Sequence, residues 1–289
     1  MRALGGIVSA LITPFDAEGA VNEAAIGPLV EFELRQGIAG FYVGGSTGEA
    51  FLQSPEERVR VLRAVAAANA GRGLLIAHVG AIATAEVVGM ARAAEACGYD
   101  AVSAVPPFYY DFSAAELVAH YRALADAVGL PVIVYNFGGK VARLTTDVLV
   151  SLLDDRRVVG VKHTSTDLYQ MERLKAHRPD AAVFNGYDEM CLAGLAMGAD
   201  GAIGTTYNFM GAHFVALERA FRAGRMDEAL DLQRRANRVI DVLVEVGVFA
   251  GTKALLGMHG VDVGRCRAPL LPLAEGAEDR LRGCLGLIS

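Results

Sequence analysis

Short apolar runs alternate with longer segments of helical periodicity along this chain, and glycine, proline, asparagine or aspartate marks most of the junctions. Eight of the apolar runs predict buried strands, at residues 6–12, 40–43, 74–78, 101–104, 131–135, 158–162, 182–185 and 201–203. Helices are expected between and after them, among them residues 22–36, 55–70, 83–96, 114–127, 145–153, 209–222, 227–247, 249–259 and 275–287. Such alternation is typical of an α/β protein with a parallel sheet and helical crossovers.

Eight strand-then-helix units favour a closed (β/α)8 barrel, the TIM barrel, over an open doubly wound sheet. No Gly-x-Gly-x-x-Gly motif opens a helix after the first strand, which argues against a dinucleotide-binding fold. We therefore expect a barrel over residues 1–223 and a C-terminal helical extension over residues 224–289 that packs on it, together forming one functional domain.

Composition adds a large core to this picture. Of the 289 residues, 53% are hydrophobic and 21% are charged, which predicts extensive burial and apolar surface hidden in subunit contacts. A net charge of −6 and the absence of any Lys/Arg run argue against nucleic acid or anionic lipid as a partner. The hydrophobic composition therefore predicts an oligomer.

The location of the protein is predicted from its cysteines and apolar runs. The four cysteines are far apart and form no Cys-x-x-Cys pair, so we expect reduced thiols in a cytoplasmic protein. The apolar stretch at residues 4–12 is interrupted early by Pro14 and has the alternation of a strand, which disfavours a signal peptide. The longest uncharged run, residues 201–217, contains several polar residues and does not suit a membrane span.

The candidate chemistry lies at the predicted strand ends, because a barrel builds its active site at the carboxyl ends of its strands. Lys162 ends the apolar strand at residues 158–162, where desolvation would lower its pKa and free the amine to attack a ketone. The alternative is a lysine that extends to solvent or pairs with a carboxylate. Lys162 is thus a candidate Schiff-base nucleophile.

Two further strand ends carry candidate partners for this amine. Residues 44–49 combine glycines with the hydroxyls of Ser46 and Thr47, a suitable nest for a carboxylate, although an ordinary tight turn would have the same residues. Tyr135 ends the fifth strand and could move a proton between substrate and solvent, although aromatic residues at such positions often serve packing alone.

An acidic pair and the histidines complete the candidate chemistry. Asp188 and Glu189 could bind sugar hydroxyls or cap a helix that begins near Met190, and the two roles are compatible. The six histidines have no metal-site spacing, and His163 is expected to point away from Lys162 across the strand. We expect no metal.

Three motifs together resemble a known superfamily. Gly-Gly-Ser-Thr-Gly-Glu at residues 44–49, Tyr135-Asn136 and Gly-Val-Lys at residues 160–162 resemble the signatures of the dihydrodipicolinate synthase / N-acetylneuraminate lyase superfamily, in its order and spacing. The resemblance covers nearly the whole chain. The segments that resemble the N-acetylneuraminate lyase (sialic acid aldolase) family in particular are residues 44–53, 164–171, 186–189 and 239–249.

The resemblance implies reversible cleavage of N-acetylneuraminate to pyruvate and N-acetylmannosamine, by a covalent imine on Lys162 without cofactor or metal. It implies that Tyr135 takes the proton of the C4 hydroxyl and that Ser46 and Thr47 hold the carboxylate. It also implies a homotetramer in which Tyr109 reaches a neighbouring subunit's site. The implied catalytic residues are Lys162, Tyr135, Thr47 and Tyr109, and the implied substrate-binding residues are Ser46, Thr47, Thr164, Gly186, Asp188, Glu189 and Thr205.

One segment departs from the family pattern. After Asn136 the family usually has an apolar residue and then proline, whereas residues 137–143 here read Phe-Gly-Gly-Lys-Val-Ala-Arg and are one residue short. Lys140 and Arg143 add positive charge near the floor of the expected substrate pocket, so either the specificity for the sugar tail or the mobility of the pocket is expected to differ from the family pattern.

Three alternatives remain open at this point. Dihydrodipicolinate synthase would join the same pyruvate imine to an aldehyde, with Arg143 as a conceivable counterpart of its substrate-binding arginine. A 2-keto-3-deoxy sugar acid aldolase or dehydratase would share Lys162 and Tyr135. A non-catalytic 2-keto-acid sensor would keep the fold and the carboxylate nest, but the intact set of reactive residues disfavours it.

Overall fold

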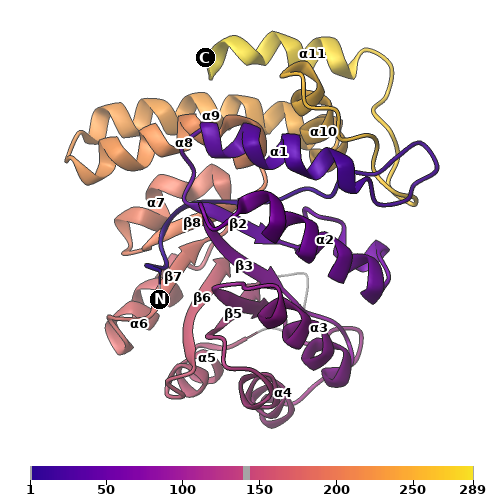
Figure 1. The fold of residues 1–289 in the computed structure, drawn as a ribbon. Helices are drawn as coiled ribbons and strands as arrows, with labels where there is room; N and C mark the ends of the chain where they lie inside the picture. Colours follow the sequence, from indigo (N-terminus) through magenta and orange to yellow (C-terminus); the bar gives the residue numbers. More distant parts are fainter. Residues whose placement is uncertain (1, 139–143, 289) are drawn as a thin grey trace.

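The computed structural model describes residues 2–138 and 144–288 and contains a closed barrel of eight parallel strands, paired in chain order from β1 to β8 and back to β1 (Figure 1). The strands are β1 Gly6–Ala10, β2 Gly40–Val43, β3 Leu74–His78, β4 Ala101–Ala104, β5 Val132–Phe137, β6 Val158–Thr164, β7 Ala182–Asn185 and β8 Gly201–Gly204. The predicted (β/α)8 barrel with a C-terminal helical extension is confirmed.

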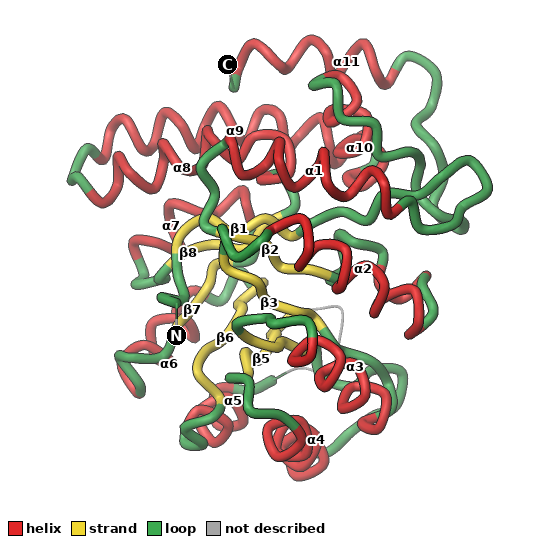
Figure 2. Tube along the Cα trace, viewed as in Figure 1, coloured by secondary structure: helices red, strands yellow, loops and turns green. Residues whose placement is uncertain are grey.

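Helices surround the barrel as an outer layer (Figure 2). Those of the eight units are α1 Glu23–Arg35, α2 Pro55–Asn69, α3 Thr84–Ala96, α4 Ala114–Ala127, α5 Thr146–Leu153, α6 Leu168–His177, α7 Cys191–Ala196 and α8 Tyr207–Arg222. Those that follow are α9 Met226–Val246, α10 Val248–Met258 and α11 Ala277–Cys284. Short 3-10 turns occur at Ala50–Leu52, Asp188–Met190 and Leu285–Leu287.

Local sequence explains where several helices begin. Ser54 accepts a hydrogen bond from the backbone N–H of Glu57, whose carboxylate accepts one from the backbone N–H of Ser54, so α2 opens with a complete capping box. Ser113 and Glu116 repeat the arrangement at α4. Thr145 caps α5 through the N–H of Val148.

The strand ends differ slightly from the predicted bounds, and hydrogen bonding explains the differences. β1 ends at Ala10 because the N–H of Ile12 donates to the side chain of Asn208 instead of to a neighbouring strand. β5 and β6 each extend two residues beyond the prediction, since their pairing continues to Phe137 and Thr164. The longer pair carries Tyr135 and Lys162 side by side.

Alternation along the strands divides the apolar residues into two cores. One fills the barrel interior, and the other lies between the strands and the helices. The interior core consists mainly of Val8, Tyr42, Leu74, Ile76, Ile133, Tyr135, Phe184 and Ile203. The interior is therefore a packed layer of side chains beneath the carboxyl ends of the strands.

A cluster of polar contacts lies at the amino ends of the strands, at the opposite end of the barrel from Lys162. Lys175 of α6 donates to both carboxylate oxygens of Asp200, at 3.1 and 3.0 Å, and to the carbonyls of Pro179 and Ala181. Asp200 directly precedes β8 and also accepts from the N–H of Val183. In a barrel, polar contacts at this end serve stability.

After α8 the chain continues into α9, which lies along α8, while α10 and α11 pack against α9 (Figure 1). No helix in the described residues is long and apolar enough to cross a membrane. All four cysteines are free thiols. The expectation that Lys140 and Arg143 add charge to the pocket floor concerns positions outside the described residues.

Candidate active site

Lys162 points into the barrel interior near the carboxyl end of β6. Only 5% of the residue is exposed, and its Nζ lies 4.4 Å from the ring centroid of Tyr42 and 4.0 Å from that of Tyr135. Burial lowers the pKa of Lys162 to about 7, although the negative charge of Asp188 opposes the change. A large fraction of the free amine is therefore present at neutral pH, as a carbonyl nucleophile requires.

Tyr42 was not among the predicted site residues. It lies on β2, its hydroxyl donates to Ser103 Oγ at 3.0 Å, and its ring forms one wall around the Lys162 amine. The alternation of β2 would have placed Tyr42 inside the barrel, but only the closed sheet shows that it meets a residue of β6.

Tyr135 is adjacent to Lys162 across the β5–β6 pair and is 3% exposed. Burial raises the pKa of Tyr135 well above its usual value, and the hydroxyls of Thr164 and Ser46 partly oppose that rise. The ring stacks on Phe137 with a centroid distance of 5.4 Å and an interplanar angle of 8°. Tyr135 is thus a protonated phenol at rest, with hydroxyl neighbours that can pass a proton on.

The loop at residues 44–49 is a tight turn whose backbone needs unusual conformations at both ends. Gly44 has φ 74° and Glu49 has φ 55°, and the N–H of Glu49 donates to the carbonyl of Ser46 at 3.0 Å. Thr47 is buried, and its Oγ1 lies 2.7 Å from Thr205 Oγ1. The turn thereby joins the ends of β2 and β8 and directs hydroxyls toward the barrel mouth.

Asp188 and Glu189 occupy different environments although they are neighbours in sequence. Asp188 is buried, and its Oδ2 accepts hydrogen bonds from the backbone N–H and the hydroxyl of Thr206, at 2.8 and 2.7 Å. Glu189 is exposed. The helix-capping interpretation is wrong, because neither the 3-10 turn at Asp188–Met190 nor α7 has a side-chain cap and the carboxylate bonds to Thr206 instead.

The second oxygen of Asp188 remains available for a ligand. Within the described residues, Asp188 Oδ1 has no hydrogen-bond partner, and burial raises the pKa of the carboxyl to about 6. A buried acceptor without a partner is costly unless a bound molecule supplies a donor. This oxygen is suited to a substrate hydroxyl.

Two glycines make room for these side chains. A Cβ added to Gly186 would lie 1.9 Å from Thr164 Oγ1, and one added to Gly204 would lie 1.7 Å from Asp188 Oδ1. Any larger residue would displace the hydroxyl or the carboxylate. Gly186 therefore matters because it has no side chain and leaves room for Thr164. The same holds for Gly204 beside Asp188, a position that was not among the predicted site residues.

Tyr109 does not join this cluster within the chain. It is 85% exposed, has φ 83°, and contacts the ring of Tyr110. An exposed aromatic residue in the left-handed region is uncommon. Its expected role depends on a second subunit.

His163 lies on the opposite side of β6 from Lys162, as expected. Its Nδ1 lies 3.3 Å from Asn136 Nδ2 and its Nε2 lies 2.9 Å from the carbonyl of Asp167. Across residues 2–138 and 144–288 no group of three or more His, Cys, Asp or Glu side chains is arranged to hold a metal ion.

An apolar cavity of about 330 Å³ adjoins the loop at residues 44–49. It lies between segments distant in sequence, since Phe249 of α10 and Leu270 face the loop residues from the C-terminal extension. The lining residues are Ser46, Glu49, Ala50, Phe51, Leu52, Val105, Phe108, Phe137, Phe249 and Leu270.

The chain is similar in sequence and in fold to several known proteins. An N-acetylneuraminate lyase of Rhizobium meliloti (strain 1021) is 55% identical over 279 residues, which cover 96% of this chain and 93% of the relative. The solved structure of CdNal from Clostridium difficile, in complex with mannosamine, matches with a TM-score of 0.97 at 32% identity and covers all of both chains.

The fold alone does not separate the activities within this group. A dihydrodipicolinate synthase from Bacillus anthracis matches with a TM-score of 0.95 at 31% identity and also covers all of both chains. The Dihydrodipicolinate synthetase family matches residues 3–286. With a closed barrel, a buried lysine on β6 and a hydroxyl-rich turn after β2, this chain belongs to the dihydrodipicolinate synthetase family.

Proposed function

We propose that this protein is an N-acetylneuraminate lyase that reversibly cleaves the sugar acid to pyruvate and N-acetylmannosamine through an imine on Lys162. The observation that carries the proposal is the Lys162 amine, buried between the rings of Tyr42 and Tyr135, with its pKa lowered to about 7. The 55% identity to the Rhizobium meliloti lyase supports the choice of substrate.

The steps follow from the chemistry of an amine and a ketone. The free amine of Lys162 attacks C2 of the open-chain substrate, and loss of water leaves a protonated imine. The C3–C4 bond then breaks, its electron pair moves into the iminium to give an enamine, and the C4 hydroxyl proton passes to the Tyr135 site as the aldehyde forms. Protonation of the enamine at C3 and hydrolysis release pyruvate and restore the amine.

Tyr135 is proposed as a relay and not as a resting base. Its raised pKa keeps the phenol protonated, so accepting the C4 proton requires that its own proton leave to a neighbour at the same time. Ser46 and Thr164 are the hydroxyls beside it. Thr47 is held by Thr205 and is proposed to act with Ser46 on the substrate carboxylate.

The sugar tail is proposed to extend over the β7 and β8 ends. Asp188 Oδ1 offers a buried acceptor for a hydroxyl, and Thr205 adds a hydroxyl of its own. Glu189, exposed beside them, is proposed to contact the outer part of the tail. This polar wall favours a polyol over the small aldehyde that a dihydrodipicolinate synthase joins to pyruvate.

We further propose a homotetramer in the cytoplasm. Tyr109 and Tyr110 are 85% and 62% exposed and Leu271 is 80% exposed, which suits a subunit contact that brings Tyr109 to a neighbouring site. The four free cysteines suit a reducing compartment. Analytical ultracentrifugation tests the assembly, and a monomer with full activity would contradict the role given to Tyr109.

The decisive experiment combines turnover with covalent trapping. Pyruvate release is measured with N-acetylneuraminate and with 2-keto-3-deoxygluconate, and pyruvate consumption is measured in the presence of an amino-aldehyde acid. In parallel the protein is treated with pyruvate and borohydride, and the modified peptide is mapped. The chain has four lysines, at positions 140, 162, 175 and 253, so the assignment is unambiguous.

Each outcome selects one of the hypotheses. Adduct on Lys162 with fast release from N-acetylneuraminate supports the lyase. An adduct on Lys162 with turnover of 2-keto-3-deoxygluconate would instead indicate a sugar acid aldolase or dehydratase of the same family. An adduct with turnover of the amino-aldehyde acid would indicate a dihydrodipicolinate synthase. Pyruvate binding without an adduct would leave a non-catalytic sensor.

A further inference from the structure

A second buried lysine, Lys253 of α10, contacts Glu49 at the end of the loop at residues 44–49. Its side chain is 3% exposed, and its Nζ lies 2.8 Å from Glu49 Oε1, 3.0 Å from the carbonyl of Thr13 and 2.9 Å from that of Arg265. Two of its three N–H donors reach the carbonyls of Thr13 and Arg265, and the ammonium forms an ion pair with the Glu49 carboxylate. Lys253 is not free to act as a nucleophile, and its function must pass through the groups it holds.

Glu49 is the residue that closes the turn carrying Ser46 and Thr47. Its φ of 55° is strained for a residue with a side chain, and its N–H donates to the carbonyl of Ser46. Such a conformation persists only where the surroundings hold it. The Glu49 carboxylate is fully buried and is held on both oxygens, by Lys253 and by the backbone N–H of Arg267 at 2.7 Å.

Thr13 closes a ring of contacts around the same turn. Its carbonyl accepts from Lys253, while its Oγ1 donates to the carbonyl of Gly48 at 2.8 Å. The end of β1, the turn after β2 and helix α10 are thereby connected through one ammonium group. Ser46 and Thr47 lie just before the two residues, Gly48 and Glu49, that this ring fixes.

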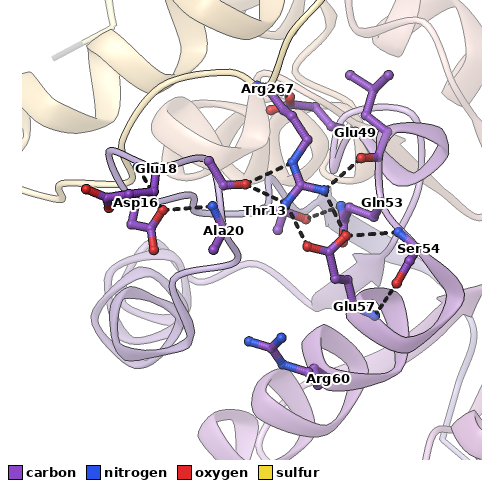
Figure 3. Close-up of polar contacts among 12 residues, drawn as sticks. Thr13, Asp16, Glu18, Ala20, Glu49, Gln53, Ser54, Glu57, Arg60 and Arg267 are labelled. Carbon is purple, nitrogen blue, oxygen red and sulfur yellow. Dashed lines mark hydrogen bonds and ion pairs between the residues drawn. The ribbon is translucent and has the colours of Figure 1, made fainter.

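Arg267 anchors the C-terminal segment to the start of α2 (Figure 3). Its guanidinium donates two parallel hydrogen bonds to the Glu57 carboxylate, both at 2.8 Å, and others to the carbonyls of Gly19 and Leu52. Bidentate pairing fixes direction as well as distance. The Arg267 backbone is therefore held where it can donate to Glu49.

We propose, building on the imine chemistry above, that Lys253 and Glu49 are positioning residues that set the geometry in which Ser46 and Thr47 bind the 2-keto acid carboxylate. The C-terminal extension is then part of carboxylate recognition and not only a stabilising cover. Lys253 and Glu49 act through the turn, and the ketone carbon is engaged by Lys162 alone. Removing the pair affects ketones that carry a carboxylate and spares those that do not.

The chain contains a matched control for a purely structural role. Lys175 at the amino ends of the strands is bound in the same manner, by one carboxylate, that of Asp200, and two backbone carbonyls. Lys175→Met therefore removes a similarly bonded but less buried ion pair without touching the turn. Lys253→Met removes the charge that holds Glu49, and the double variant Lys253→Met/Glu49→Gln leaves no unpaired charge in the fold.

The experiment compares two ketones in borohydride trapping. Pyruvate carries a carboxylate and hydroxyacetone does not, while both can form an imine with Lys162. For Lys253→Met and for the double variant, the pyruvate concentration that gives half-maximal trapping is expected to rise between about 10-fold and 100-fold. Trapping by hydroxyacetone is expected to stay within about twofold of the wild type, and Lys175→Met is expected to change neither ketone.

Several results would overturn the proposal. These are an unchanged half-maximal pyruvate concentration in a folded Lys253→Met or double variant, an equal loss for both ketones, and a rise with Lys175→Met as large as with Lys253→Met. If Lys253→Met does not fold, the double variant alone decides the question. If neither variant folds under conditions where Lys175→Met folds, Lys253 and Glu49 serve stability, and the positioning role is overturned. Absence of trapping in the wild type would instead refute the imine chemistry itself.

Discussion

The Nζ atom of Lys162 lies 4.0 Å from the ring centroid of Tyr135, its neighbour across the β5–β6 pair. Two effects act on the amine in opposite directions at this place. Burial disfavours the ammonium, whereas the ring faces and the Asp188 charge favour it. Burial is the larger effect, and the resulting pKa of about 7 leaves both forms present at neutral pH.

The rate of imine formation is expected to rise with pH through about 7. The free enzyme must lose the Lys162 proton before the amine can attack, so the unreactive ammonium predominates on the acid side of that pKa. The measurement is the initial rate of adduct formation with subsaturating pyruvate and cyanoborohydride across this pH range. A midpoint near 10.5, the ordinary value for lysine, would mean that burial does not act on this group.

Replacing Tyr135 by phenylalanine is expected to separate the two halves of the reaction. The ring that packs against Lys162 and Phe137 remains, so pyruvate should still be trapped on Lys162. Cleavage of the sugar acid should fall by about 10²-fold to 10⁴-fold, because the C4 proton loses its acceptor. Steady-state pyruvate release and trapping on the same preparation check this, and full turnover by the variant would remove Tyr135 from proton transfer.

Gly204→Ala is expected to damage the sugar-tail side of the site selectively. The added Cβ would lie 1.7 Å from Asp188 Oδ1 and 2.5 Å from its Cγ, so the carboxylate must move. Cleavage should fall by at least about 10-fold while pyruvate trapping changes much less.

The control for this change is Gly89→Ala in α3, where a Cβ would meet nothing within 4 Å. An alanine in a helix is favoured over glycine, so this variant should keep its activity and keep or slightly raise its thermal midpoint. Equal effects on cleavage and trapping in Gly204→Ala would indicate general disruption and would contradict a specific role for the Asp188 position.

Lys162→Met is expected to abolish turnover and to stabilise the fold. The pKa of Lys162 falls from 10.5 to about 7 on folding, so below pH 7 the native state carries the full cost of a buried charge. As pH rises from about 7 to 10.5, the unfolded chain loses its proton too, and this cost disappears. The gain in thermal midpoint should therefore be at least about 2 °C at neutral pH and shrink in alkali.

Calorimetry across that pH range provides the check, with Lys253→Met as the comparison. Lys253 is paired with Glu49, so its removal should lower the midpoint instead. A loss of stability in Lys162→Met would show that the amine's contacts with the two rings outweigh the cost of its burial.

The sequence was sufficient to predict the barrel, and it also predicted Lys162 as the reactive group, which stays a prediction. Short apolar runs with helical segments between them have few solutions other than a parallel sheet, and eight units close it. A lysine at the end of an apolar strand is by itself compatible with a structural role, and the motif at residues 44–49 together with Tyr135 made Lys162 a candidate nucleophile. Ser54, Ser113 and Thr145 each cap a helix by accepting from the backbone N–H three positions later, so their role depends on local sequence alone.

Only the tertiary structure decided which distant side chains meet. The contact of Thr47 with Thr205, the ring of Tyr42 beside Lys162 and the pairing of Glu49 with Lys253 join residues from 120 to 204 positions apart, for which local patterns contain no information. Asp188 likewise bonds to Thr206 instead of capping its own helix, because the pairing of β7 with β8 brings the residues after β8 near Asp188 and offers the carboxylate two donors there. Periodicity and local propensity determined the elements and their order, whereas the packing of the closed sheet determined the partners, since polar groups removed from water must find them wherever the fold brings them together.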